Sequence, residues 1–303
     1  MNMNDNMSMT AEVSAFARGY HTRESEAICS DPLAVKLLGE ERFAQIAAQM
    51  TAGREWFLPG DTGTPEEALR RIVNQKLGPA VLARTAWWEQ ELRREMTMGL
   101  RQVLLPGAGL ESLPCRQTTG MERLAFYEVD TPAVLGEKEK RLRAAGIETP
   151  ANVYRAAADL TGAWGDTLLR ETAYDPEKRT LAALLGVVYY LPREAMEALL
   201  EQMAGLMPKG SSLLFDCPMR DFGAAEDAAG QQRALAAGAG ETMAAGYTPT
   251  ELALLLERHG FLIYEDIGPE MIGERFYAGY NRTHPDSPLV PLPGTALILA
   301  VRH

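Results

Sequence analysis

One segment restricts the possible folds of this chain more than any other. Residues 101–106, which are mostly apolar, lead directly into Gly107-Ala108-Gly109, and a second mostly apolar run, residues 125–129, ends on Asp130. An acid about twenty residues beyond a strand–glycine turn is typical of a nucleoside-binding α/β unit. The glycines let the backbone approach a ligand closely, because they carry no Cβ. Asp130 can then accept hydrogen bonds from both ribose hydroxyls.

The same segment argues against a dinucleotide. A third glycine, three positions after the second, normally lets the helix pack close to a pyrophosphate. Here that position is Ser112, and Glu111 precedes it. A carboxylate there would repel a phosphate. S-adenosylmethionine contains adenosine without phosphate, and its charges call for acids at the ribose and the amine and for a cation at the carboxylate.

The order of motifs resembles the leucine carboxyl methyltransferase family, including its bacterial branch of the polyketide O-methyltransferase type. The resemblance extends from about residue 10 to the C-terminus. It is carried by Ala17-Arg18, Ser30-Asp31-Pro32-Leu33-Ala34, Ala83-Arg84-Thr85, residues 102–112, and Tyr127-Glu128-Val129-Asp130-Thr131-Pro132 with Lys138 downstream. It implies a Rossmann-like class I methyltransferase that uses S-adenosylmethionine.

Roles for several residues follow from this resemblance. Arg84, together with Arg18, is expected to hold the methionine carboxylate of the cofactor, since a guanidinium can donate two parallel hydrogen bonds. Gly107 and Gly109 would line the methionine and ribose region. Asp130 would bind the ribose hydroxyls.

The resemblance adds further cofactor-binding candidates and one departure. Glu128 is a candidate that is expected to face the other side of the strand from Asp130, and Asp159 and Leu160 would contact the adenine. Gly186 is a candidate because it lies in the segment 185–191, which corresponds to a family motif near the cofactor. The family usually has an acid before that position, near the cofactor amine, whereas this chain has Leu185. Either another group supplies the contact, or binding is weaker, or the function has changed.

Simpler explanations compete with some of these roles. An arginine on a helix such as 80–92 is most often a solvated charge, although the motif spacing favours a role for Arg84. Asp159 could instead cap a following helix. Trp87 and Trp88 are expected to pack between the N-terminal helices and the sheet rather than to stack on a ligand.

Residue patterns divide the chain into helical and α/β parts. Residues 11–99 are expected to form a helical cap that contributes to the cofactor site, with helices at 11–22 and 32–50 and a loop at 54–64. From residue 101, strands and helices alternate, which predicts an α/β fold with a doubly wound sheet. The expected later strands are 152–157, 180–188, 212–216, 261–267 and 296–302, and the resemblance to class I methyltransferases implies that one of the last two is antiparallel. Ala- and Gly-rich residues 221–246, and 268–292 with several aromatic side chains, are candidate substrate lids.

Composition restricts the partners. The 303 residues carry a net charge of −11, which disfavours nucleic acid because phosphate neutralisation needs clustered cations. The three cysteines have no spacing typical of a metal site or a disulfide framework, so no metal is expected. No apolar run approaches the roughly 18 residues of a membrane span. Residues 1–10 lack signal-peptide character and are expected to be disordered, and the cytoplasm is the expected location.

Methyl transfer asks little of the protein beyond alignment and exclusion of water. A carboxylate acceptor is ionised at neutral pH, whereas a hydroxyl such as a phenol benefits from a general base. His284 and His21 are the candidate bases. We therefore expect an O-methyltransferase acting on a small-molecule carboxylate or hydroxyl; the resemblance also allows a protein C-terminal carboxylate. The oligomeric state stays open.

Two alternatives remain. One is a cofactor-binding protein that has lost or changed catalysis, which the leucine at position 185 makes credible. The other is a nicotinamide-dependent oxidoreductase, which would need Tyr-x-x-x-Lys. Tyr189 and Tyr190 are followed at that spacing by Arg193 and Glu194, which counts against it.

Overall fold

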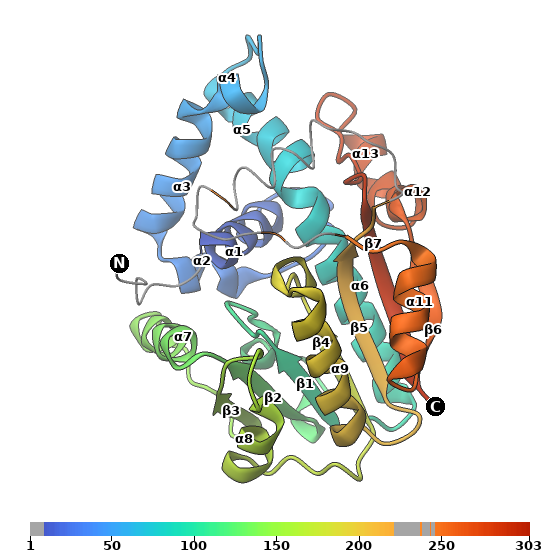
Figure 1. Cartoon of the computed structure of the whole chain (residues 1–303). Helices are drawn as coiled ribbons and strands as arrows, with labels where there is room; N and C mark the ends of the chain where they lie inside the picture. The colour runs from blue at the N-terminus through green and yellow to red at the C-terminus, as the bar shows by residue number, and fades with distance from the viewer. Residues whose placement is uncertain (1–8, 221–236, 238–242, 244–245) are drawn as a thin grey trace.

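The computed structural model describes residues 9–220, 237, 243 and 246–303. Within them a seven-stranded sheet has the order β3-β2-β1-β4-β5-β7-β6. This arrangement confirms the expected Rossmann-like α/β fold (Figure 1). The strands are β1 (Gln102–Pro106), β2 (Ala125–Asp130), β3 (Val153–Ala157), β4 (Thr180–Leu184), β5 (Ser212–Pro218), β6 (Phe261–Ile267) and β7 (Thr295–Arg302).

Strand direction fixes where a ligand can bind. Strands β1 to β5 pair in parallel, and β7 runs antiparallel to both β5 and β6, in agreement with the expectation of one reversed strand. The chain moves outward from β1 through β2 to β3 and then returns to place β4 on the other side of β1. In open α/β sheets the crevice at such a reversal, at the carboxyl ends of the strands, is where ligands bind.

Helices cover both faces of the sheet and its carboxyl end. Those before the sheet are α1 (Met9–Thr22), α2 (Pro32–Leu38), α3 (Glu40–Ala52), α4 (Arg54–Phe57), α5 (Pro65–Ile72), the π-helix η1 (Val73–Leu77) and α6 (Gly78–Thr97). The later ones are η2 (Leu113–Cys115), η3 (Met121–Arg123), α7 (Pro132–Ala144), α8 (Trp164–Glu171), η4 (Val188–Tyr190), α9 (Arg193–Leu206), α11 (Pro249–Arg258), α12 (Pro269–Ile272), η5 (Gly273–Tyr277) and α13 (Ala278–Thr283).

Alternating strand residues pack into two separate cores, as the period of a strand requires. Leu104 on β1 contacts the layer formed by α8, α9 and α11. Its neighbours Val103 and Leu105 face the opposite layer, where Trp87 and Trp88 of α6 are fully buried. The two tryptophans therefore pack against the sheet, as expected.

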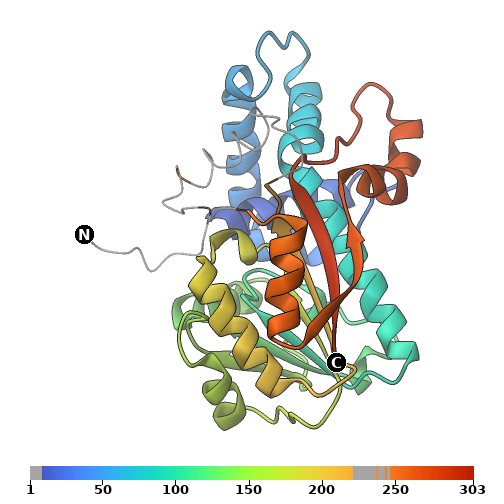
Figure 2. The same cartoon turned by 45° about the vertical axis from the view of Figure 1, so that its right-hand side comes forward.

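The N-terminal helices form a cap above the carboxyl ends of the parallel strands (Figures 1 and 2). The cap has its own apolar cluster, which includes Phe16, Ile46 and Ile72 and reaches Leu110 beyond β1. The expected single helix over 32–50 is wrong, because Gly39 with φ +79° separates α2 from α3. Residues 54–64, expected as a loop, begin with the short helix α4.

Helix α6 continues from the cap onto the sheet. The π-helix η1 joins α5 to α6, and the residues at both junctions keep helical backbone angles. One helical rod thus runs from the capping box at Thr64 to the face of β1. The side chains that this rod directs into the crevice are therefore held by both the cap and the core.

Of the two expected lids, only residues 268–292 lie fully within the described part of the chain. Most of residues 221–246, and residues 1–8 of the expected disordered N-terminus, lie outside the described part of the chain. Residues 268–292 pack against α6, where the Tyr277 hydroxyl donates to the Pro79 carbonyl at 2.5 Å and Arg275 pairs with Glu91. None of them lines the cavity described below, and their role as a substrate lid stays a prediction. No helix in the described ranges has both the length and the apolar character needed to cross a membrane.

Candidate active site

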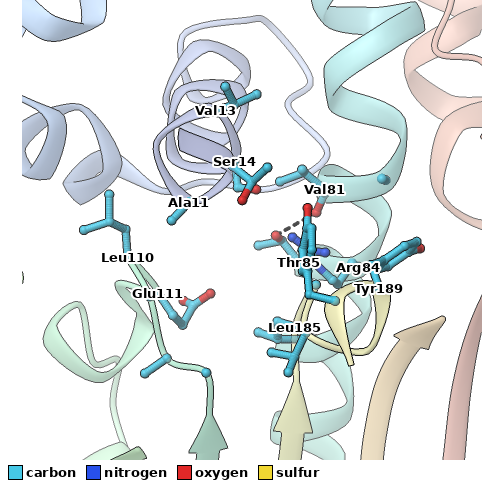
Figure 3. Close-up of a pocket in the computed structure, with 18 of the residues that line it drawn as sticks. Ala11, Val13, Ser14, Val81, Arg84, Thr85, Leu110, Glu111, Leu185 and Tyr189 are labelled. Carbon is cyan, nitrogen blue, oxygen red and sulfur yellow. Dashed lines mark hydrogen bonds between the residues drawn. The ribbon is translucent and has the colours of Figure 1, made fainter. Parts of the chain in front are cut away.

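A cavity of about 560 Å³ opens at the carboxyl ends of β1 and β4, beneath helix α1 and beside α6 (Figure 3). It occupies the crevice that the strand order predicts. Its walls come from α1, from the η1–α6 rod, from the turn after β1 and from the turn after β4. Six of the nine cofactor-binding candidates line it: Arg18, Arg84, Gly107, Gly109, Asp130 and Gly186.

The glycine turn after β1 requires its glycines for two reasons. Gly107 has φ +73°, and a Cβ there would lie 2.5 Å from Val187 Cγ2. Gly109 has φ +45°, and its N–H donates to Asp130 Oδ2 at 2.9 Å. A side chain at Gly107 would therefore be strained and would collide with the opposite wall.

Asp130 is oriented at the end of β2 by backbone groups. Its Oδ2 accepts from Gly109, and its Oδ1 accepts from the Thr131 N–H at 2.8 Å. Burial raises the pKa of Asp130, against the lowering effect of these two hydrogen bonds. Each carboxylate oxygen can accept a further hydrogen bond, so the group still suits a ribose diol.

Arg84 reaches the cavity from α6 and is held by an acid that the sequence did not indicate. Its Nη1 donates to Asp216 Oδ2 at 2.7 Å, and Asp216 Oδ1 accepts from the Gly186 N–H at 2.6 Å. Asp216 is fully buried on β5. No described residue bonds to Arg84 Nη2, so this nitrogen can donate to a ligand carboxylate. The only signal for Asp216 was an acid that ends the apolar run 212–215.

Gly186 makes room for that guanidinium. The expected strand over 180–188 stops at Leu184, and the chain turns at Gly186 with φ +74°. A Cβ on Gly186 would lie 2.6 Å from Arg84 Nη1. The guanidinium therefore packs directly on the backbone of the turn after β4.

Arg18 connects the cap to the glycine turn. Its Nε donates to Asp31 Oδ2 and its Nη2 to the Leu110 carbonyl, both at 2.8 Å. Asp31 also accepts from Ser112 Oγ at 2.6 Å. Burial by itself would raise the pKa of Asp31, but Arg18 and Arg116 hold it below its usual range. Arg18 thus lines the cavity with much of its donor capacity already used.

Three candidates lie outside the cavity wall. Glu128 is fully buried and pairs with Lys138 at 2.6 Å and Arg155 at 2.9 Å, so its charge is neutralised within the sheet layer, and its contact with the cofactor stays a prediction. Asp159 is exposed and accepts from the Thr161 N–H at 2.9 Å. Leu160 is near the glycine turn, 3.6 Å from where a Cβ of Gly107 would lie.

Asp159 does not cap the helix that follows. Helix α8 begins at Trp164, five residues later, after an N-cap at Ala163 without a side-chain cap. The helix expected to start at 160 or 161 is therefore wrong, and Asp159 stabilises a turn instead. The adenine contact of Asp159 and Leu160 stays a prediction.

Neither candidate base reaches the cavity. His21 is fully buried, accepts from the Ile28 N–H through Nδ1 and packs 4.8 Å from the Tyr280 ring. Burial lowers the pKa of His21 to about 4. His284 stacks on the other side of the same tyrosine at 4.0 Å and contacts Ser25. Both histidines fasten the segment 280–284 to the cap.

Two charged residues in the wall were not singled out as ligand contacts. Lys76 lies on the π-helix η1, and Glu111 follows the glycine turn. Sequence gave only one signal for Glu111, its position directly after Gly-Ala-Gly-Leu. For Lys76 there was none, because a lysine near the end of a helical segment is ordinarily solvated.

The described wall suits the charges and shape of S-adenosylmethionine. The two glycines remove side chains where the nucleoside would pass, Asp130 keeps acceptor capacity for its ribose, and Arg84 keeps a free donor for its carboxylate. Sheet order, reversed β7 and these groups together define a nucleoside-binding protein of the class I methyltransferase type.

Comparisons with known proteins identify the family. A model of the leucine carboxyl methyltransferase family matches residues 11–204. The Bacillus subtilis protein YktD, whose name assigns it to the S-adenosyl-L-methionine-dependent methyltransferases, is 31% identical over 282 residues, covering 89% of this chain and 91% of YktD. The chain belongs to the leucine carboxyl methyltransferase family. This confirms the expected enzyme class, a methyltransferase that uses S-adenosylmethionine.

Solved structures support the fold. A DUF574 family protein from Streptomyces avermitilis aligns with a TM-score of 0.61 at 15% identity, covering 98% of each chain. A protein of Thermobifida fusca described as a methyltransferase aligns with a TM-score of 0.51 at 16% identity, covering 99% of this chain and 96% of its own. At these identities the likeness extends to the fold alone.

Proposed function

We propose that the protein is an O-methyltransferase whose acceptor is a small, largely apolar carboxylic acid. When bound, S-adenosylmethionine supplies an electrophilic methyl group on a sulfonium. The observation that carries the choice of acceptor is Lys76, a cation in the cavity wall. Within the described residues no side chain or backbone group forms a hydrogen bond or an ion pair with it.

Lys76 is too far along the rod to share the ligand group of Arg84. Eight positions separate the two residues, which corresponds to about 12 Å along a helix. Both line the same cavity. If Arg84 takes the carboxylate of the cofactor, Lys76 is available for a second anion, and the acceptor is the remaining ligand.

The wall of the cavity that contains Lys76 is mostly apolar. Met50, Leu77, Leu191 and Met243 line this cavity, and Tyr190 adds an aromatic ring. A volume of about 560 Å³ is within the range of pockets for small organic molecules. An apolar body with one carboxylate matches that combination of surface and charge.

The lack of a histidine in the described part of the wall also favours a carboxylate acceptor. None of the described histidines lines the cavity. A carboxylate with a pKa of about 4 needs no proton removed at neutral pH, whereas a phenol with a pKa of about 10 gains from a general base. The protein would then act by attracting the acid, aligning its oxygen and excluding water.

Transfer of a labelled methyl group tests the proposal directly. Purified protein with S-adenosylmethionine would be assayed against a panel of apolar carboxylic acids and their matched alcohols and amides. We expect ester formation from acids only. In Lys76→Met, the KM for the acid should rise about tenfold or more with little change in kcat, while Lys36→Met, an exposed lysine on α2, should behave as wild type.

Two other outcomes separate the alternatives. Binding of S-adenosylhomocysteine without turnover on any acceptor would favour a cofactor-binding protein that has lost catalysis. Preference for alcohols over acids, unaffected by Lys76→Met, would reject the carboxylate acceptor. Family membership already favours methyl transfer over the oxidoreductase alternative.

A further inference from the structure

Glu111 is a buried carboxylate in the cavity wall, directly after the glycine turn. It is 7% exposed. Its Oε1 accepts from the Ser112 N–H at 2.9 Å and the Leu113 N–H at 2.8 Å. These two bonds fix the orientation of the carboxylate at the start of η2.

The second oxygen of Glu111 is not used by the protein. Across the described residues nothing donates a hydrogen bond to Oε2. The nearby Arg18 directs its Nε and Nη2 to Asp31 and Leu110. In Figure 3 the Glu111 side chain points from the glycine turn into the cavity. Oε2 is not among the described buried polar atoms that lack a partner, so it is open to the cavity, where a cationic donor that entered could form a charge-assisted hydrogen bond with it.

Elimination assigns a ligand group to this oxygen. Among the described residues that line the cavity, the carboxylates are Glu111 and Asp130. Asp130 sits at the end of β2, where the ribose is expected, and already accepts from two backbone N–H groups. The position where the family usually has an acid near the cofactor amine is Leu185, which cannot accept a hydrogen bond.

We propose that Glu111 Oε2 accepts a hydrogen bond from the α-ammonium group of the cofactor, in place of the acid absent at Leu185. Glu111 and Arg84 extend from opposite walls of the cavity (Figure 3). One offers a negative and the other a positive group. The amino-acid end of the cofactor carries the complementary pair, an ammonium and a carboxylate on one carbon. This inference rests on the use of S-adenosylmethionine but not on the acceptor.

Calorimetric titration of two ligands against Glu111→Gln isolates this contact. Glutamine keeps a carbonyl oxygen for the Ser112 and Leu113 amides but replaces Oε2 with an NH₂ donor. S-adenosylhomocysteine should bind about ten- to one-hundred-fold more weakly to the variant than to wild type. Its analogue without the amino group should bind both proteins equally. Glu139→Gln, at an exposed site on α7, is the matched control and should leave both affinities unchanged.

Restoring an acid on the opposite wall gives a second readout. Leu185→Glu in the Glu111→Gln background should recover at least tenfold of the lost S-adenosylhomocysteine affinity, because it returns a carboxylate to the same space. Glu111→Asp, which keeps the charge but withdraws it by one methylene, should show the same amine-selective loss and serves if the glutamine variant does not fold.

The outcomes distinguish this inference from the proposed function. An equal loss for both ligands, or no loss for either, would overturn the role of Glu111 while leaving methyl transfer intact. A wild-type protein that binds S-adenosylhomocysteine and its analogue without the amino group equally well would also overturn the role of Glu111. Failure of the wild type to bind S-adenosylhomocysteine at all would overturn the cofactor assignment, and with it both proposals.

Discussion

Asp216 and Arg84 form a buried ion pair of 2.7 Å that joins strand β5 to helix α6. The acid also accepts from the Gly186 N–H, so three elements meet at one carboxylate. Without it, the guanidinium would lie at the cavity wall with no counter-ion. The pair therefore fixes the position of the cation that we propose for the carboxylate of the cofactor.

Removing that acid should destabilise the whole fold. Asp216→Asn leaves Arg84 buried and unpaired, so we expect the free energy of unfolding to fall by about 3–5 kcal/mol. Urea denaturation followed by circular dichroism measures this. The control is Glu171→Gln, whose ion pair with Arg170 is exposed, and it should cost less than about 1 kcal/mol. Equal losses in the free energy of unfolding would show that the buried ion pair stabilises the fold no more than the exposed one.

A methyl group at position 186 should displace Arg84. In Gly186→Ala the new Cβ would lie 2.6 Å from Nη1, so the affinity for S-adenosylhomocysteine should fall at least tenfold, measured by calorimetry. Gly60→Ala is the matched control, because φ is +76° there but no atom lies within 4 Å of the added Cβ. Both variants carry similar backbone strain. If Gly186→Ala and Gly60→Ala bind S-adenosylhomocysteine with the same affinity, steric displacement of the Arg84 guanidinium does not explain the loss.

The ribose contact should depend on charge at position 130. Asp130→Asn should weaken S-adenosylhomocysteine about ten- to one-hundred-fold, because an amide presents one acceptor where the carboxylate presents two. A ligand without the ribose hydroxyls should lose far less. Since burial raises the pKa of Asp130, wild-type affinity should also decline as the pH falls toward that raised value. An affinity that Asp130→Asn leaves unchanged contradicts the assignment.

His21 should make stability depend on pH. Burial lowers its pKa from 6.5 to about 4, so the unfolded chain binds a proton more readily than the folded one between these values. The stabilisation is complete above pH 6.5 and is lost as the pH falls toward 4, by up to about 3 kcal/mol. Urea titrations of wild type and His21→Gln over this range measure it. Parallel curves for the two proteins would show that another group is responsible.

Much of the fold could be predicted from patterns among neighbouring residues in the sequence. The glycine turn, the acid at the end of β2 and the strand alternation that buries Leu104 on one side and Val103 on the other all follow from neighbouring residues. The reversed last strand followed from the family resemblance. These features repeat over short distances, so a single sequence displays them.

Long-range partners were not visible in the same way. Asp216 is 132 positions from Arg84, and Glu128 is neutralised by Lys138 and Arg155 from two other elements. Nothing local tells an acid that holds an arginine from one that binds a ribose. His21 and His284 were candidate bases by residue type alone, and packing against Tyr280 removed both from the cavity. Which side chain pairs with which charged group is decided only when distant segments come together in the folded chain.

The π-helix at 73–77 carries Lys76, the residue proposed to bind the acceptor, at a point where the length of the helix could change. A π-helix holds one residue more than the corresponding stretch of α-helix, so deleting one residue there would return the stretch to an α-helix and leave the flanking helices nearly in place. Lys76, inside this stretch, would be redirected, while Arg84, downstream and paired with Asp216 on β5, would stay in place. Acceptor choice could then diverge through single-residue length changes in one helix, with the donor half of the enzyme inherited intact.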